Sequence, residues 1–430
     1  MEKNRITFFQ MGVLIFFTVS VIVGLLVLAL SKGGDSVSSK DRVNLSVWGS
    51  ASESAFQALI SASGYSGDSV DSKLNVSYKY IPEKDFNGAL LEALAGGYGP
   101  DIILMTDTNM ALHAKRTNIL SHQYYSERLY KDSFIEGAEM FLSPEGVVAF
   151  PFSVDPLVMY WNRDMFNNAG VATPPKYWDE FSSSSLVDRL SVKSSQSIEK
   201  SAFSLGGFSN IENAKEIISA MMMQAGAPIV RNSVVALQNA ESPVYFYTEF
   251  ANPSRTTYTW NRSLPNSKQM FISDRLAVYF GFASEAGDIK AKNPNLNFDM
   301  ASFPQLRDGK NRTTFGRFSA LAVLKQSKNT PSAFEAVFKM TGAQPVLAWT
   351  QATGLPPVRR DLLSSRPSDA LGAVLFDSAF WARAFADPDH NQTKNLFGEM
   401  IDSIVSGRST VGNAVGQFSS RLYNIISSQQ

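Results

Sequence analysis

The chain has 430 residues, in which 39 lysines and arginines balance 39 aspartates and glutamates. This length predicts two or three folding units, and the balanced charge gives no electrostatic reason to expect nucleic-acid binding. The chain contains no cysteine, which excludes disulfides, thiolate metal sites, cysteine nucleophiles and a lipidated N-terminal cysteine.

The N-terminal segment is the most apolar part of the chain. Residues 6–30 carry no charge and are rich in Val, Leu, Ile and Phe, and a run of this length exceeds the ~20 residues that cross a bilayer core. A cleavable signal peptide has an apolar region of only about 7–15 residues. We therefore expect residues 1–34 to form a retained transmembrane anchor and tether. Residues 29–31 have the form of a cleavage site, which leaves processing open, and basic residues on both sides of the span leave its orientation open.

The next part of the chain alternates between strand and helix patterns. Alternating apolar residues predict strands at 43–47 and 74–80, and an apolar helical face predicts a helix at 53–62. Asp85 is the expected N-cap of a second helix, and the apolar run 102–105 predicts a strand that is covered on both faces. This order of elements is typical of an α/β lobe with helices on both faces of the sheet.

A second series of elements follows. It is expected to contain an apolar strand-like run, a further apolar strand segment and four amphipathic helices. The run covers 271–282, the segment covers 321–324, and the helices cover 212–224, 331–340, 395–406 and 411–426. No repeat of fixed period is visible in the sequence, which argues against a solenoid or a propeller.

Sequence motifs for nucleotide binding, serine hydrolysis and zinc catalysis are absent. Asp387, Asp389 and Asn391 have calcium-loop spacing, but Gln392 and Gly398 stand where such a loop needs Gly and Glu. The 3 histidines share no metal-ligand spacing. We therefore expect no metal, no cofactor and no catalytic residue, although composition does not exclude a carboxylate pair for glycoside hydrolysis.

The segment 149–181 contains several motifs in a characteristic order. It has a proline in a predicted crossover, an apolar strand ending in Tyr-x-Asn, a basic residue, a short helix, Ala-Gly, and then Pro-x-x-Trp-x-Glu-Phe. These elements are Pro151, Tyr160, Asn162, Arg163, Asp164, Phe166, Ala169, Gly170, Pro175, Trp178, Glu180 and Phe181. The segment resembles the central signature of family 1 extracellular solute-binding proteins, the maltose-binding-protein type.

Other segments resemble the same family and follow its order. They lie at 100–103, 271–283, 302–304, 315–317 and 354–357. Two positions depart from the family pattern, because Asp274 and Phe282 stand where Gly and Trp are usual.

The resemblance implies an α/β periplasmic-binding-protein fold, with two lobes joined by hinge crossovers and preceded by the N-terminal transmembrane helix. In this arrangement residues 43–151 and 298–342 form lobe 1, and residues 152–297 and 343–430 form lobe 2. The ligand lies in the cleft between the lobes, which close around it by a hinge motion.

The resemblance also implies which residues contact the ligand. They belong to the loops after strands, to a crossover and to the late helical region, and the polar and aromatic side chains among them suit a sugar. The candidate ligand-binding residues are Trp48, Ser50, Thr106, Asp107, Asp155, Phe208, Trp260, Phe282 and Trp381. Structural roles remain open for several of them: packing for Trp48 and Trp260, turn capping for Asp155 and helix capping for Asp107.

The function that the resemblance implies is capture of a small solute for import. We expect an extracytoplasmic substrate-binding protein of an ABC transporter that delivers a sugar or oligosaccharide to permease subunits. We expect a monomer in the cell membrane, with a single span and an extracytoplasmic binding domain. Two alternatives remain open: a membrane-tethered glycosidase or lyase, and a ligand-sensing or adhesion ectodomain.

Overall fold

The computed structural model describes residues 42–65, 73–194, 197–231, 233–309 and 312–428. The anchor predicted at residues 6–30 lies outside the described residues. Within these ranges, no helix combines the length and the apolar character needed to cross a membrane.

The first described elements confirm the predicted alternation of strands and helices. They are β1 (Val43–Gly49), α2 (Glu53–Ala62), β2 (Leu74–Tyr80), α3 (Glu83–Ala95) and β3 (Ile102–Thr106). Strand β1 lies between β2 and β3 and pairs with both in parallel, as expected for strands that are joined by helices.

The predicted N-cap of helix α3 is wrong. The helix begins at Glu83, two residues before Asp85, and Pro82 occupies the N-cap position without a side-chain hydrogen bond. Asp85 and Glu83 lie in the first helical turn, where carboxylates interact favourably with the helix dipole. Asp85 therefore supports the start of the helix from inside its first turn.

Short elements connect β3 to the long strand that follows. They are α4 (Met110–His113), η1 (Ala114–Arg116), β4 (Leu120–Ser121), α5 (Glu127–Ser133), η2 (Glu136–Phe141), β5 (Leu142–Ser143) and β6 (Gly146–Val147). Strands β4, β6 and β5 form a small antiparallel sheet.

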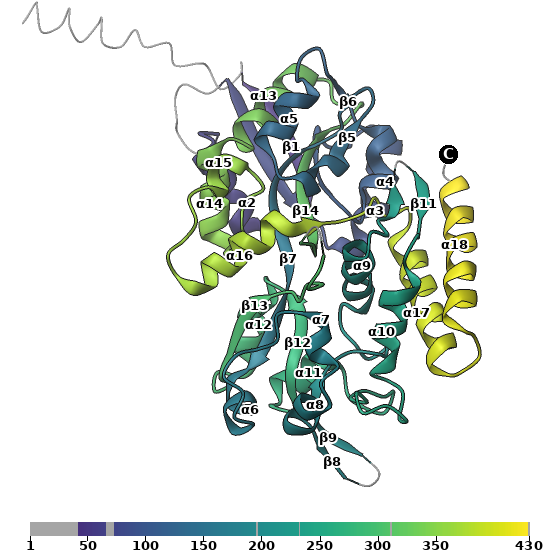
Figure 1. The fold of residues 1–430 in the computed structure, drawn as a ribbon. Coiled ribbons are helices and arrows are strands. Elements are labelled where there is room, and N and C mark those ends of the chain that lie inside the picture. The colour runs from purple at the N-terminus through teal and green to yellow at the C-terminus, as the bar shows by residue number, and fades with distance from the viewer. Residues whose placement is uncertain (1–41, 66–72, 195–196, 232, 310–311, 429–430) are drawn as a thin grey trace, which may run out of the picture.

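The long strand β7 (Phe150–Asn162) runs through both halves of the molecule (Figure 1). Its first part pairs with β14 (Thr314–Val323), and its second part pairs with β12 (Leu276–Phe282) and β13 (Phe298–Ser302). A single sheet of ten strands results, with the order β2-β1-β3-β14-β7-β12-β9-β8 along its main path. Thus β7 and β14 form the structural connection between the halves.

The second half alternates helices with short strands. Its elements before β12 are α6 (Arg163–Asn168), α7 (Trp178–Phe181), α8 (Ser184–Leu190), β8 (Val192–Lys193), β9 (Ile198–Phe203), α9 (Ala214–Gln224), β10 (Ile229–Arg231), β11 (Val234–Ala236), α10 (Glu241–Glu249) and α11 (Ser267–Ile272). Helix α12 (Glu285–Lys292) follows β12.

The apolar run predicted at 271–282 is divided by a turn. Helix α11 ends at Ile272, Asp274 has a φ of 58°, and β12 begins at Leu276. A positive φ favours glycine, and Asp is one of the few other residue types that adopt it with modest strain. Asp274 thus occupies a turn conformation in which the usual glycine of the family pattern would be unstrained.

The C-terminal part is mainly helical. Its elements are α13 (Thr330–Met340), α14 (Ala343–Thr353), α15 (Arg360–Leu363), α16 (Ala370–Trp381), β15 (Ala382–Arg383), α17 (His390–Val405) and α18 (Val411–Ser427). The helices predicted at 331–340, 395–406 and 411–426 are confirmed. Helix α17 begins earlier than predicted because the Asp389 side chain accepts a hydrogen bond from the Gln392 backbone N–H and caps the helix.

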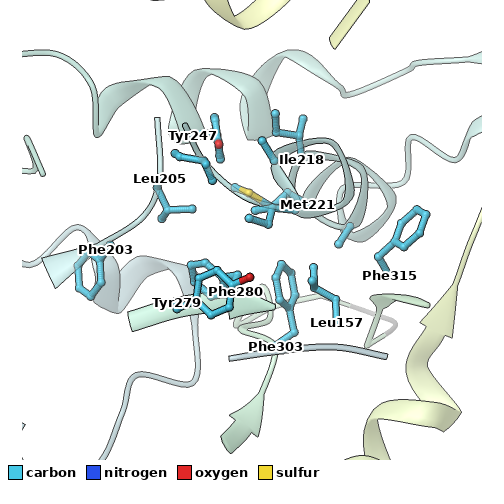
Figure 2. Close-up of a cluster of buried hydrophobic side chains, with 14 of the residues drawn as sticks. Leu157, Phe203, Leu205, Ile218, Met221, Tyr247, Tyr279, Phe280, Phe303 and Phe315 are labelled. Atoms are coloured by element: carbon cyan, nitrogen blue, oxygen red, sulfur yellow. The ribbon is translucent and has the colours of Figure 1, made fainter. Parts of the chain in front are cut away.

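Buried apolar side chains form two separate cores. The first core gathers side chains from residues 45–154 and 318–363, with Ala379 and Ala382, and the second gathers them from residues 157–303 and 385–426, with Phe315 and Leu375. Figure 2 shows part of the second core, with Ile218 and Met221 of α9 and Tyr279 and Phe280 of β12 among the buried side chains. The molecule is therefore a two-lobed α/β protein whose cores meet along β7 and β14.

Candidate functional site

A cavity of about 510 Å³ opens where the two cores meet. The first lobe lines this cavity with the loop after β1, the end of β3, part of β14 and the end of α14. Asp155 of β7 and Ser284 after β12 line its other side. A neighbouring cavity of about 460 Å³ shares Ser50, Thr106 and Arg317 with the first and extends to the start of α17. We refer to both cavities together as the interlobe cleft.

Strand geometry brings the loops of the first lobe to this edge. Because β1 and β3 are parallel neighbours, their carboxyl ends meet at the same side of the sheet. The Tyr78 hydroxyl donates to the Ala51 carbonyl over 2.8 Å and holds the loop after β1. The Thr106 N–H donates to the Asn109 side chain over 2.8 Å, which turns the chain at the end of β3. Ser50 and Thr106 consequently present hydroxyl groups to one cavity.

Arg317 of β14 is the central cation of the cleft. It lies opposite Asp155 of β7 in the antiparallel register, and its guanidinium is 3.7 Å from the centre of the Phe282 ring. Its side chain is exposed, and the exposed part lines both cavities of the cleft. Burial lowers the pKa of the guanidinium, yet the nearby carboxylates Glu216, Asp155 and Asp107 raise it by more. Arg317 therefore remains charged, with the carboxylates of these three residues close to it.

Two carboxyl groups of the cleft resist ionisation. Asp107 is 3% exposed and accepts a hydrogen bond from the Phe318 N–H over 3.1 Å. Burial raises its pKa from 3.8 to about 7, against the opposing effect of Arg317. Asp155 accepts from the Ser284 N–H over 3.0 Å, and burial raises its pKa from 3.8 to about 6. Near neutral pH Asp107 is thus partly protonated and can accept or donate a hydrogen bond to a ligand, whereas Asp155 is mainly ionised and accepts.

The model of bacterial extracellular solute-binding proteins matches residues 67–373. The chain belongs to this family. The family consists of binding proteins, which agrees with the expectation of a binder without catalytic function.

Individual relatives and solved structures are similar to this solute-binding protein at low sequence identity. A binding protein of Brucella abortus (strain 2308) is 23% identical over 301 residues, which cover 66% of this chain and 69% of the relative. The cyclic α-maltosyl-1,6-maltose binding protein from Arthrobacter globiformis has a TM-score of 0.73 at 15% identity, covering 90% of this chain and 100% of its own. The sugar-binding protein MalE from Xanthomonas citri has a TM-score of 0.72 at 17% identity, covering 90% and 98%.

A tagatose-bound ABC transporter solute-binding protein from Thermotoga lettingae TMO has a TM-score of 0.62 at 18% identity, covering 89% of this chain and 99% of its own. At these identities the structural likeness shows the shared two-lobed fold.

Four of the predicted ligand contacts line the interlobe cleft. They are Ser50, Thr106, Asp107 and Asp155. The alternative roles for the two carboxylates do not match their observed partners, because Asp107 accepts from Phe318 on β14 and helix α4 has Asn109 at its N-cap. Asp155 accepts from the backbone of Ser284, which is far away along the chain.

Trp48 and Trp260 lie in the two cores and outside the cleft lining defined by the described residues. Trp48 is 8% exposed, with the Lys79 ammonium 4.1 Å from its ring centre. Trp260 is fully buried, and its indole N–H donates to Asn210 over 3.0 Å. Their surroundings match the packing alternative, and a ligand role for either one stays a prediction.

The other three aromatic candidates also lie elsewhere in the described part of the chain. Phe282 is fully buried at the end of β12, beneath Arg317. Phe208 is half-buried against the second core, next to Gly398 of α17. Trp381 ends α16 and lines a different cavity. Ligand contacts by these residues remain predictions from the family resemblance.

Several cleft residues were not predicted from the sequence. Arg317, Ser284, Trp349 and His390 line it. Arg317 carried a usable signal, since it is the single charged residue in the apolar strand β14. Trp349 gave no such signal, because an aromatic residue in an apolar helix is most simply interpreted as core.

Proposed function

We propose that this chain is the substrate-binding protein of an ABC importer and captures a sugar or oligosaccharide in the interlobe cleft. The observation that carries the proposal is the composition of the cleft. Ser50 and Thr106 supply hydroxyls, Asp155 a carboxyl and Arg317 a guanidinium to one cavity, and the largely buried Trp349 forms part of its wall. Sugars need such a set, because their hydroxyls exchange hydrogen bonds with hydroxyl, carboxyl and guanidinium groups.

Solved structures of similar fold support the ligand class and the transporter partner. Their descriptions name cyclic α-maltosyl-1,6-maltose, maltotetraose and α-D-tagatose as ligands, and one names an ABC transporter. Permease subunits are accordingly the proposed protein partner. The lobes would close over the sugar by bending where β7 and β14 pass from one core to the other.

The membership of the two cores supports a refined division into lobes. Val346 and Trp349 of α14 pack in the first core, and Met300 of β13 packs in the second. We therefore propose that residues 343–363 move with lobe 1 and that residues 298–315 move with lobe 2. This differs from the division that the family resemblance implies.

The proposed location is the outer face of the cell membrane, with residues 6–30 as a single retained span. Their uncharged, apolar character supports this proposal. The full-length protein should fractionate with membranes, and deletion of residues 1–34 should move a folded protein to the soluble fraction. A mature N-terminus at Lys32, detected by mass spectrometry, would contradict a retained anchor.

Ligand binding can be tested by thermal shift and calorimetry with tagatose, maltose, maltotetraose and glucose. A sugar that binds the folded state must raise the melting temperature. At a concentration 100 times its Kd it adds about 2.7 kcal/mol to the free energy of unfolding. Asp155→Ala should weaken binding, whereas Asp164→Ala, an exposed carboxylate on α6, should leave it unchanged. A panel without any shift would refute a sugar ligand, and release of hydrolysed product would favour the glycosidase alternative.

A further inference from the structure

A second cavity lies apart from the interlobe cleft. Its volume is about 510 Å³, and among the described residues it shares no lining side chain with either cavity of the cleft. Its walls are the loop 173–177, strand β13, the end of β7 and helix α16. Figure 1 shows α16 beside β7 and above β13, and the three elements are in contact.

Three aromatic rings from separate segments face this cavity. Trp161 is the only residue of β7 that is not buried, although the strand otherwise lies inside the protein. Tyr177 comes from the loop before α7, and Trp381 is the last residue of α16. All three are partly exposed. The Arg307 guanidinium covers the Tyr177 ring, 4.3 Å from its centre, so Trp161 and Trp381 are the two rings left for a ligand.

Cationic groups complement the rings. The guanidinium of Arg312 lies 4.8 Å from the centre of the Trp381 ring, and Lys176 lines the same cavity. Neither cation has a carboxylate within 4.0 Å in the part of the chain that the structure describes. A guanidinium that stacks on an indole keeps its N–H edges available, and those edges match the two oxygens of a carboxylate.

Among the described residues, negative charge in the cavity lining is smaller than positive charge. Asp299 is its one lining carboxylate among the described residues, and its Oδ1 already accepts from the Met300 N–H over 2.8 Å. Gln305 is occupied as well, since its side chain bonds to the backbone of Phe303 and Thr313. Among the described residues, the lining therefore offers the indoles of Trp161 and Trp381 and two cations, Arg312 and Lys176, against the single carboxylate of Asp299.

We propose that this cavity is a second binding site, for a saccharide ring that carries a carboxylate, such as a hexuronate unit. The sugar ring stacks between the indoles of Trp161 and Trp381, and its carboxylate pairs with Arg312 and Lys176. This proposal does not depend on a sugar ligand in the interlobe cleft. Trp381 was predicted from the sequence as a ligand contact in the interlobe cleft. In this proposal it contacts a ligand in the second cavity instead.

The test uses fluorine NMR on the full-length protein in detergent, with 5-fluorotryptophan at its 6 tryptophans. Trp161→Phe and Trp381→Phe assign two resonances, and Trp349 reports on the interlobe cleft. Sodium D-glucuronate should shift the Trp161 and Trp381 resonances saturably. D-Glucose at matched ionic strength should bind at least about tenfold more weakly, because it lacks the charge-assisted pair.

Variants separate the two cavities. Arg312→Gln should weaken glucuronate binding about tenfold, whereas Arg128→Gln, an exposed arginine on α5, should not change it. Asp155→Ala alters the cleft and should leave the Trp161 and Trp381 shifts intact. The proposal is overturned if glucuronate leaves both resonances unmoved, if Arg312→Gln binds like the wild type, or if Asp155→Ala abolishes the shifts.

Discussion

Asp107 and Asp155 are held in surroundings that disfavour their charge. Burial raises their pKa values from 3.8 to about 7 and about 6, with Arg317 opposing the effect. A raised carboxyl pKa means that the folded state binds the proton more tightly than the unfolded state does. The contribution of both groups to folding is therefore most favourable below about pH 4 and is lost as the pH rises through the folded pKa values.

We expect Asp107→Asn to change the pH dependence of stability. The amide does not titrate, and it keeps an acceptor for the Phe318 N–H. Between about pH 4 and pH 7 the free energy of unfolding of the variant should rise relative to wild type, by up to about 1.4 kcal/mol per pH unit. Urea unfolding at a series of pH values measures this difference.

The matched control for Asp107→Asn is Asp132→Asn on α5, whose carboxylate is solvent-exposed. Its stability should follow the wild-type pH curve. If Asp107→Asn and wild type run parallel from pH 4 to pH 7, Asp107 ionises like an ordinary exposed carboxyl and its environment has been misinterpreted.

Individual side chains were predictable only where the sequence fixes their direction. Ser50, Thr106 and Asp107 follow strands, and the carboxyl ends of parallel strands meet at one edge, so their approach could be inferred. Trp260 lies in the loop between α10 and α11, its partner Asn210 is 50 residues away along the chain, and no local pattern reveals that hydrogen bond. An aromatic ring near a strand end fits a ligand platform and a core equally well.

At the level of elements, a buried ion pair joins α9 to the segment before α17. Lys215 and Asp387 form an ion pair in which the side chains are 3% and 4% exposed. Thr393 donates to the second oxygen of Asp387 over 2.7 Å, and His390 lies 3.5 Å from the first. Because His390 also lines the cleft, this pair helps to fix one wall of the binding site.

Breaking the pair on one side should be costly. Lys215→Met leaves the Asp387 carboxylate buried without its cation, and the expected loss of stability is about 3–5 kcal/mol. The double variant Lys215→Met with Asp387→Asn should recover much of this loss, because no unpaired charge remains buried. A double-mutant cycle by urea unfolding measures the coupling.

An exposed pair provides the control for this cycle. Arg421→Met removes the exposed ion pair between α18 and Glu399 of α17, and it should cost less than about 1 kcal/mol. A loss at Lys215→Met no larger than that at Arg421→Met would show that the buried pair does not hold α9 to the segment before α17.

Elements in which apolar residues recur with a clear period were predictable, and elements without such a recurrence were not. The apolar stripe of α18 and its Thr410 N-cap define a helix from local signals alone. Helix α16 is apolar on most faces, because Leu375 packs in the second core and Ala379 in the first. A helix that is covered from two sides lacks the amphipathic pattern on which such a prediction depends.

At the scale of the whole molecule, a single sheet contributes strands to both cores. Strand β7 passes from the first core at Val154 to the second at Leu157, and β14 passes between them from Phe318 to Phe315. The family resemblance correctly implied two lobes and crossover strands. It also assigned α14 to lobe 2, and the refined division departs from it on packing between segments far apart in sequence, which no local pattern reveals.

Lobe motion gives a direct test of that assignment, and the cysteine-free chain allows site-specific spin labels without background. Cysteines at the exposed positions Glu92 on α3, Gln351 on α14 and Gln417 on α18 place labels on three elements. A sugar that raises the melting temperature should change the Glu92–Gln417 distance by more than about 2 Å, as hinge closure requires. The Glu92–Gln351 distance should stay constant, because α14 packs in the first core. If Gln351 instead keeps its distance to Gln417 and moves relative to Glu92, α14 belongs to lobe 2 and the refined division is wrong.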